Sequence, residues 1–148
     1  MQLSRHFSLA ELTVSDTAAR LGLSNQPATA QHMANLRRLA GVLEAVRAIW
    51  GRPMTIISAY RSPAVNRAVG GVATSDHANG LAADLRIAGV DGQDVARAIA
   101  ASAIEFDQLI WYRPTGSVHI GIGARMRRQV RTNPTTKAGA SLLVGIVP

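Results

Sequence analysis

The most informative stretch of the chain is Ser75-Asp-His-Ala-Asn-Gly-Leu-Ala-Ala-Asp84. It holds a histidine and an aspartate seven residues apart, and both side chains can bind a metal ion. The glycine and the small apolar residues between them are typical of a loop that runs into a buried strand. From Leu81 to Ile87 apolar residues alternate with polar or small ones. This alternation predicts a strand that holds Asp84 on the face turned away from the core.

A second segment, Ser117 to Ile122, alternates in the same way and places His119 on its open face. Two imidazoles and one carboxylate on neighbouring strands predict a zinc site with His77, Asp84 and His119 as ligands. Three protein ligands leave a fourth position for water, which is typical of catalytic rather than structural zinc. Taken singly, each histidine is more often an ordinary hydrogen-bonded group, and Asp84 alone is compatible with a turn or an ion pair. The prediction therefore depends on the combination.

The length of 148 residues suits one domain with a substantial core, and a hydrophobic content of 47% is that of a globular protein. The chain has no cysteine, which excludes disulfides, cysteine-ligated zinc and thiol nucleophiles. No stretch approaches the ~20 apolar residues of a membrane span. The N-terminus lacks the apolar region of a signal peptide, so a protein working outside the cytoplasm must be released by other means.

The net charge of +7 favours polyanionic partners, namely nucleic acid, anionic lipid or acidic cell-wall polymers. The charge is uneven, because residues 124–148 hold no acid and five cations, Arg125, Arg127, Arg128, Arg131 and Lys137. We interpret residues 1–123 as the domain and 124–148 as a basic C-terminal extension that helps surface binding but plays no part in the zinc site. A solvated tail is the alternative. Nucleic-acid binding is disfavoured, because no recognised nucleic-acid motif is present.

Local patterns predict helices first and strands later. A short helix is expected after Ser8, with further helices at residues 15–22, 28–50, 63–69 and 93–103. Strands are expected at residues 54–58, 81–87, 106–111 and 117–122, with 127–132 as an added edge strand. The predicted fold class is α+β, with N-terminal helices packed on a small antiparallel sheet that carries the zinc site.

Several blocks of sequence stand together around the ligand motif. The motif itself is Ser75-x-His77-x2-Gly80-x-Ala82-x-Asp84, followed by the distant strand histidine His119. The other blocks are Phe7-Ser-Leu-Ala-Glu-Leu12, Ser58-Ala-Tyr-Arg-Ser-Pro63, Asn66-Arg67 and Phe106-Asp-Gln-Leu-Ile110. Over roughly residues 3–123 the chain resembles the zinc D-Ala-D-Ala carboxypeptidase family of peptidoglycan peptidases, in its compact phage and prophage branch. The resemblance implies the Hedgehog/DD-peptidase fold.

The resemblance also implies roles for individual residues. His77, Asp84 and His119 would bind Zn²⁺, and Arg61 would hold a peptide carboxylate with its bidentate guanidinium. The hydroxyl of Ser75 would add a contact to that carboxylate. The alternatives are an arginine that caps a loop and an ordinary loop serine.

The sequence departs from the family at the general base, which takes a proton from the zinc-bound water and passes it to the leaving amine. Many relatives carry an acid three residues before the last zinc histidine, where this chain has Gly116, and others carry a glutamate where it has Trp111-Tyr112-Arg113. By elimination Asp107 is the candidate base, with a strand-starting Asp bonded to backbone as the alternative. Asp76 is set aside, because an extended loop would point its side chain away. Tyr112 is the candidate hydrogen-bond donor to the oxyanion.

The function predicted from these residues and the resemblance is a zinc-dependent peptidase that hydrolyses peptidoglycan stem peptides. It would act as a carboxypeptidase or as an endolysin, with metal-bound water attacking the amide. The missing glutamate motivates an alternative, a zinc-bearing phage structural or cell-wall-binding module that has lost its base. We expect synthesis in the cytoplasm and action on the cell wall after release or as part of a phage particle. The bond that is cut and the oligomeric state stay open.

Overall fold

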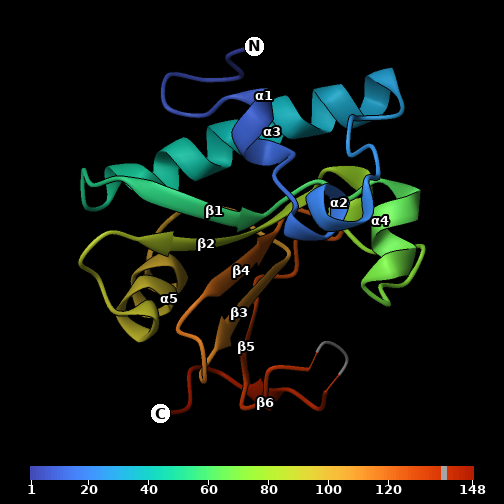
Figure 1. Ribbon diagram of the computed structural model, residues 1–148. Coiled ribbons are helices and arrows are strands. Elements are labelled where there is room, and N and C mark those ends of the chain that lie inside the picture. The colour runs from blue at the N-terminus through green and yellow to red at the C-terminus, as the bar shows by residue number, and fades with distance from the viewer. Residues whose placement is uncertain (138–139) are drawn as a thin grey trace.

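The computed structural model describes residues 1–137 and 140–148, so residues 138–139 of the C-terminal extension lie outside it. Within the described residues the strands form one six-stranded sheet in the order β1-β2-β4-β3-β5-β6 (Figure 1). The strands are β1 (Met54–Ser58), β2 (Ala82–Ile87), β3 (Gln108–Tyr112), β4 (Val118–Gly121), β5 (Gln129–Asn133) and β6 (Leu143–Val144). The mixed α+β class is confirmed.

The N-terminal helices are α1 (Leu9–Leu12), α2 (Asp16–Leu21) and α3 (Ala30–Ala48). They are followed by α4 (Pro63–Ala68), the 3-10 helix η1 (His77–Asn79) and α5 (Gly92–Ala101). Each α-helix begins where the sequence offers a side-chain cap, as at Ser8, whose hydroxyl accepts the backbone N–H of Glu11. Figure 1 shows α3 running across the molecule above β1, with α5 beside β2 and both C-terminal strands at the far end of the sheet.

The core lies between one face of the sheet and helices α3 and α5. Leu36, Leu39 and Leu43 of α3 and Ile99 of α5 are fully buried against strand residues. On the sheet side the core residues are Ile56, Ala83, Leu85, Leu109, Val118 and Ile120. The alternation predicted for β2 and β4 is therefore confirmed, and the opposite face is left for polar groups.

The prediction of a wholly antiparallel sheet is wrong for one pair of strands, β3 and β5. β5 runs parallel to β3, with Leu109 opposite Val130 and Trp111 opposite Thr132. The physical reason is that β4 is already paired on both edges, by β2 and by β3. The chain that returns after β4 therefore pairs with the free edge of β3, whose direction it shares.

The C-terminal segment is part of the sheet. β5 pairs with β3 along its whole length, and β6 pairs with β5 through Arg131 opposite Val144. Thr132 and Asn133 are buried. Two of the cations in this segment are held by the protein itself, because Arg127 pairs with Asp107 and Arg128 donates to the carbonyl oxygens of Ala100, Ser102 and Ile104 at the end of α5.

Among the described residues, the structure contains no helix with both the length and the apolar character needed to cross a membrane.

Candidate metal centre

His77, Asp84 and His119 converge on the open face of the sheet. Asp84 and His119 are direct cross-strand partners on β2 and β4. Nδ1 of His119 lies 2.9 Å from Oδ1 of Asp84, and Nε2 of His77 lies 3.5 Å from Oδ2 of the same carboxylate. One ligand atom from each residue lies within 4.8 Å of the other two. The fold therefore brings together the three side chains that the sequence analysis predicted to share one site.

The loop before β2 presents His77 to this point. Residues 77–79 form η1, which ends at Gly80 with φ of +73°, a left-handed conformation that favours glycine. A Cβ on Gly80 would also lie only 3.2 Å from the carbonyl oxygen of His32 and from Cγ of Leu36. Gly80 thus provides both the turn into β2 and the close approach to α3, so the glycine within the motif has a structural reason.

The imidazole of His77 is held in one tautomer. Its Nδ1 lies 2.7 Å from the carbonyl oxygen of Ala59, which can only accept a hydrogen bond, so Nδ1 carries the hydrogen. Nε2 is then left with its lone pair facing Asp84. A backbone carbonyl that fixes the second nitrogen of a metal-ligating histidine is a common outer partner. The side chain of His77 is buried, which limits its movement.

The carboxylate of Asp84 is held in its ionised form. Burial alone raises the pKa of a carboxyl group, but the adjacent imidazoles of His119 and His77 outweigh burial and hold the pKa of Asp84 well below its usual range. An ionised carboxylate beside two imidazoles is a donor set of the hard-oxygen and nitrogen type that suits zinc.

The family of the chain follows from a comparison with known protein families. The family model described as Peptidase M15 matches residues 5–121, which include all three converging residues.

The chain belongs to the peptidase M15 family.

Members of this family are zinc-dependent metallopeptidases, so the resemblance to the zinc D-Ala-D-Ala carboxypeptidases is confirmed. A search of curated proteins finds none that matches the chain. The donor set of His77, Asp84 and His119 fits the metal that the family uses, because two nitrogens and one carboxylate leave a position open for a reacting group.

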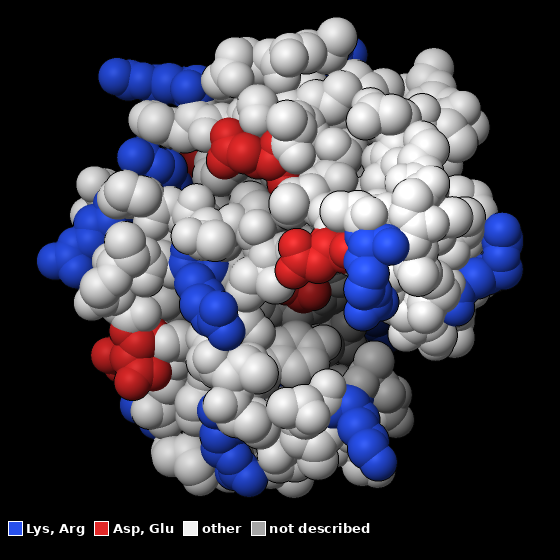
Figure 2. Space-filling view, viewed as in Figure 1, with Lys and Arg blue, Asp and Glu red and all other residues white. Residues whose placement is uncertain are grey.

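A cleft of about 580 Å³ runs beside the cluster along β3. Tyr112, at one end of that strand, and Asp107, just before the other end, both line the cleft. His119, Arg61, Ser75 and Asp76 also line it. Figure 2 shows the same face of the molecule as Figure 1, hollowed near its centre, with Lys and Arg side chains spread around it.

Arg61 reaches the cluster from the loop between β1 and α4. Its backbone N–H donates to the carbonyl oxygen of His77 at 3.0 Å, which ties this loop to η1. Its Nε is buried and has no hydrogen-bond partner among the described residues. Burial lowers the pKa of Arg61, although the charge of Asp84 opposes that shift. The side chain is therefore a partly desolvated donor that faces the cleft with spare hydrogen-bonding capacity.

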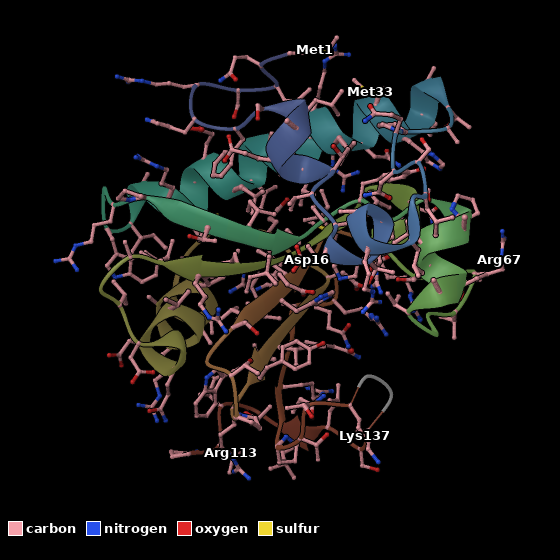
Figure 3. The ribbon with its side chains drawn as sticks, viewed as in Figure 1. Met1, Asp16, Met33, Arg67, Arg113 and Lys137 are labelled. Atoms are coloured by element: carbon pink, nitrogen blue, oxygen red, sulfur yellow. The ribbon has the colours of Figure 1, made fainter. Side chains whose placement is uncertain are left out.

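A second hollow joins Arg61 to the N-terminal helices. Asp16, at the start of α2, lines it together with Arg61 and Asp84. Asp16 is labelled near the centre of Figure 3, where α2 overhangs the sheet. Arg61, the predicted substrate-binding arginine, thus lies where the cleft, the candidate metal ligands and α2 meet.

Tyr112, at the end of β3, lies on the same face of the sheet as the cluster. It lines a smaller cavity together with Arg61, His77, Asp84 and His119. Burial and the nearby charge of Asp84 raise the pKa of Tyr112 to about 12. Its hydroxyl therefore keeps its hydrogen at neutral pH and can donate it, as the oxyanion role requires.

Asp107 is more strongly engaged than the prediction of a free base assumes. Its Oδ1 accepts from the backbone N–H and from Nε of Arg127 at 3.0 and 2.8 Å, and its Oδ2 accepts from Nη2 at 3.0 Å. These hydrogen bonds hold the pKa of Asp107 below its usual range. The carboxylate lines the cleft, but both oxygens are occupied by one arginine, which weighs against the role of proton acceptor.

Ser75 lines the cleft, and its hydroxyl oxygen accepts the backbone N–H of His77 at 3.2 Å. This bond stabilises the start of η1. The hydroxyl hydrogen stays available to a ligand, so the substrate-binding role of Ser75 stays a prediction.

Two features of the site depart from the sequence analysis. Asp76 adopts helical backbone angles at the start of η1, and its side chain lines the cleft rather than pointing away. The C-terminal segment also reaches the site, because Ala124, Arg125 and Arg127 line the cleft and Thr136 lines the cavity at the cluster. No local pattern signals either feature, because η1 is too short to show a periodicity and the C-terminal segment reaches the cleft only by pairing with β3.

Proposed function

We propose that the chain is a zinc-dependent peptidase that hydrolyses the stem peptides of peptidoglycan, as a carboxypeptidase or as an endolysin-type endopeptidase. The proposal narrows the metallopeptidase activity of the family to one class of substrate. The observation that carries it is the buried Nε of Arg61, which has no hydrogen-bond partner among the described residues and lies in the same cavity as His77, Asp84 and His119. A peptide with a carboxylate close to its scissile bond suits this pairing of a cation and a metal site.

Three residues of the cavity, Arg61, Tyr112 and His77, have distinct parts in this proposal. Zinc, when bound, supplies a Lewis acid and lowers the pKa of a coordinated water. Arg61 holds the substrate carboxylate and so fixes the distance of the amide from the cluster. Tyr112 donates its hydroxyl hydrogen to the oxygen on which negative charge develops. His77 keeps its hydrogen on Nδ1, because the carbonyl of Ala59 accepts it there.

The proton acceptor in this proposal is Asp107. Asp107 stays our candidate from elimination, although its ion pair with Arg127 works against it. For Asp107 to accept a proton, Arg127 has to release at least one carboxylate oxygen. Asp107→Asn separates this role from a structural one, since it keeps the shape of the side chain.

The Hedgehog/DD-peptidase architecture is part of the same proposal, supported by the six-stranded sheet with the cluster on β2 and β4. Adhesion to anionic wall polymers is supported by the exposed cations Arg125 and Lys137. We place the action at the cell wall, reached after release from the cell or on a phage particle.

The decisive experiment is digestion of purified peptidoglycan by the full chain, with and without a chelator, with product masses read by mass spectrometry. We expect soluble products whose mass differences identify one scissile amide, and their loss on chelation with recovery on adding zinc. The variant His77→Ala is the matched control for contaminating hydrolases. Zinc binding without any product would instead support the binding module that has lost its base.

A further inference from the structure

Among the described residues, the second ring nitrogen of His119 has no hydrogen-bond partner of the kind that His77 has. Nδ1 of His119 faces Asp84, so Nε2 faces the opposite side of the ring. A histidine that binds a metal through one nitrogen usually donates the hydrogen on the other to a carboxylate, a carbonyl or water. For His77 that acceptor is the carbonyl oxygen of Ala59. The structure raises the question of which group does this for His119.

The carboxylate of Asp76 lies across a small gap from this nitrogen. A Cβ on Gly121 would lie 3.1 Å from Oδ2 of Asp76 and 3.4 Å from Nε2 of His119, so both atoms border the space that this glycine leaves empty. A water near this space that lies about 2.8 Å from each atom would join them through two hydrogen bonds. Both side chains line the open cleft, so water has access to the space between them.

Two glycines leave the room for this carboxylate. A Cβ on Gly123 would lie 3.2 Å from both oxygens of Asp76, as close as the Cβ that Gly121 lacks. Asp76 itself makes no capping bond to η1, so its carboxylate is not spent on the helix that it begins. The neighbouring Asp107 is neutralised by Arg127, which leaves Asp76 as the carboxylate that is free to accept from the histidine.

We propose that Asp76 is a positioning residue for His119, accepting the Nε2 hydrogen through one bridging water over Gly121. This fixes the ring with Nδ1 toward Asp84 and raises its basicity as a ligand. The inference rests on the proposed metal centre and concerns how tightly it holds zinc, not which peptide is cut. The proposal also explains why residue 121 is a glycine, because its φ is not positive and the strand backbone therefore does not require one.

The test is the zinc affinity of the full chain, measured by competition with a chromogenic chelator. Asp76→Asn and Asp76→Ala should each weaken zinc binding about 10-fold or more, the usual effect of losing such a partner. Gly121→Ala keeps the charge of Asp76 but fills the gap, and should weaken binding to a similar extent. Because both changes remove one interaction, the double variant should bind zinc no worse than either alone.

The control variant is Asp94→Asn, which removes one negative charge from α5 on the other face of the sheet. It should leave zinc affinity unchanged. Unchanged affinity in Asp76→Asn overturns the proposal. So does an Asp76→Asn that weakens binding while a folded Gly121→Ala does not, because the charge alone would then be acting.

Ring spectroscopy tests the same point if Gly121→Ala fails to fold. In long-range ¹H–¹⁵N spectra of the zinc-loaded protein, His119 should carry its hydrogen on Nε2, and that hydrogen should exchange with water faster in Asp76→Asn. Equal exchange in the two proteins counts against the bridge. Affinity and exchange do not require turnover, so an inactive parent protein would remove the proposed peptidase function and leave this inference standing.

Discussion

Replacing Arg61 by alanine should separate substrate binding from stability more cleanly than any other change in the cleft. The guanidinium makes no hydrogen bond to the described residues through its buried Nε, while the backbone N–H that ties the loop to His77 does not depend on the side chain. The fold therefore loses little in Arg61→Ala. We expect the melting temperature to stay the same or rise slightly, because a buried donor without a partner is removed.

The loss in catalysis should be large. A bidentate contact to a carboxylate contains two charge-assisted hydrogen bonds, and such bonds contribute about 1.5–3 kcal/mol each. Losing about 3 kcal/mol lowers kcat/KM roughly 100-fold, at 1.4 kcal/mol per factor of ten. Most of the change should appear in KM if Arg61 binds ground state and transition state equally. Arg61→Lys keeps the charge but not the planar fork, so its kcat/KM should lie between those of the parent protein and Arg61→Ala.

The assay is hydrolysis of a soluble stem peptide, with initial rates followed by chromatography and stability by thermal unfolding. Arg67→Ala is the control, since Arg67 lies on the neighbouring α4 but projects outward at the edge of the molecule (Figure 3). It should change neither quantity. An Arg61→Ala protein that cleaves as well as the parent would falsify the carboxylate role and leave Arg61 as a loop anchor.

Three further predictions concern the rest of the cleft. Tyr112→Phe should lower kcat about 100-fold with zinc affinity unchanged, as measured by steady-state kinetics and chelator competition, and full activity would remove the oxyanion role. Asp107→Asn should lower the melting temperature at neutral pH, because Arg127 loses its carboxylate. Since the pKa of Asp107 is lowered in the fold, its stabilisation is present above the ordinary pKa of about 3.9 and is lost as the pH falls through the lowered value, so unfolding followed from pH 7 downward should show a smaller acid effect in the variant. A large loss of kcat in Asp107→Asn under conditions where the variant stays folded would favour Asp107 as the base. Truncation after Gly123 removes β5 and should unfold the domain, as judged by circular dichroism; a truncated chain with parent-like unfolding would show that β3 needs no partner on that edge.

The convergence of His77, Asp84 and His119 was predictable because each of the three lies in a sequence pattern of short range. Asp84 and His119 each stand at the polar position of an alternating strand, and alternation fixes the face on which a side chain lies. Because β2 and β4 are neighbours in the sheet, Asp84 and His119 lie directly opposite each other. The position of His77 was predictable for a different reason, because Gly80 marks the turn that leads from η1 into β2.

The electrostatic partners were not predictable, because they come from segments far apart in sequence. Asp107 and Arg127 are twenty residues apart and meet only because the chain loops back after β4. The carbonyl of Ala59 that fixes the tautomer of His77 has no side chain to signal it. The helical backbone of Asp76 depends on η1, which is too short for periodicity to reveal.

The boundary between a domain of residues 1–123 and a C-terminal extension does not match how the site is built. Asn133 pairs with Tyr112 in the parallel ladder, and its carbonyl accepts the backbone N–H of Arg113 at 3.0 Å. The side chain of Asn133 then holds the following turn through the backbone N–H of Thr135 at 2.8 Å, and the next residue, Thr136, lines the cavity at the cluster. Tyr112, the residue proposed to stabilise the oxyanion, therefore pairs with a strand that follows the last proposed metal ligand in the sequence. Substitutions in this turn should change access to the cluster without touching a ligand, which makes the basic C-terminal segment a part of the site as well as of the surface.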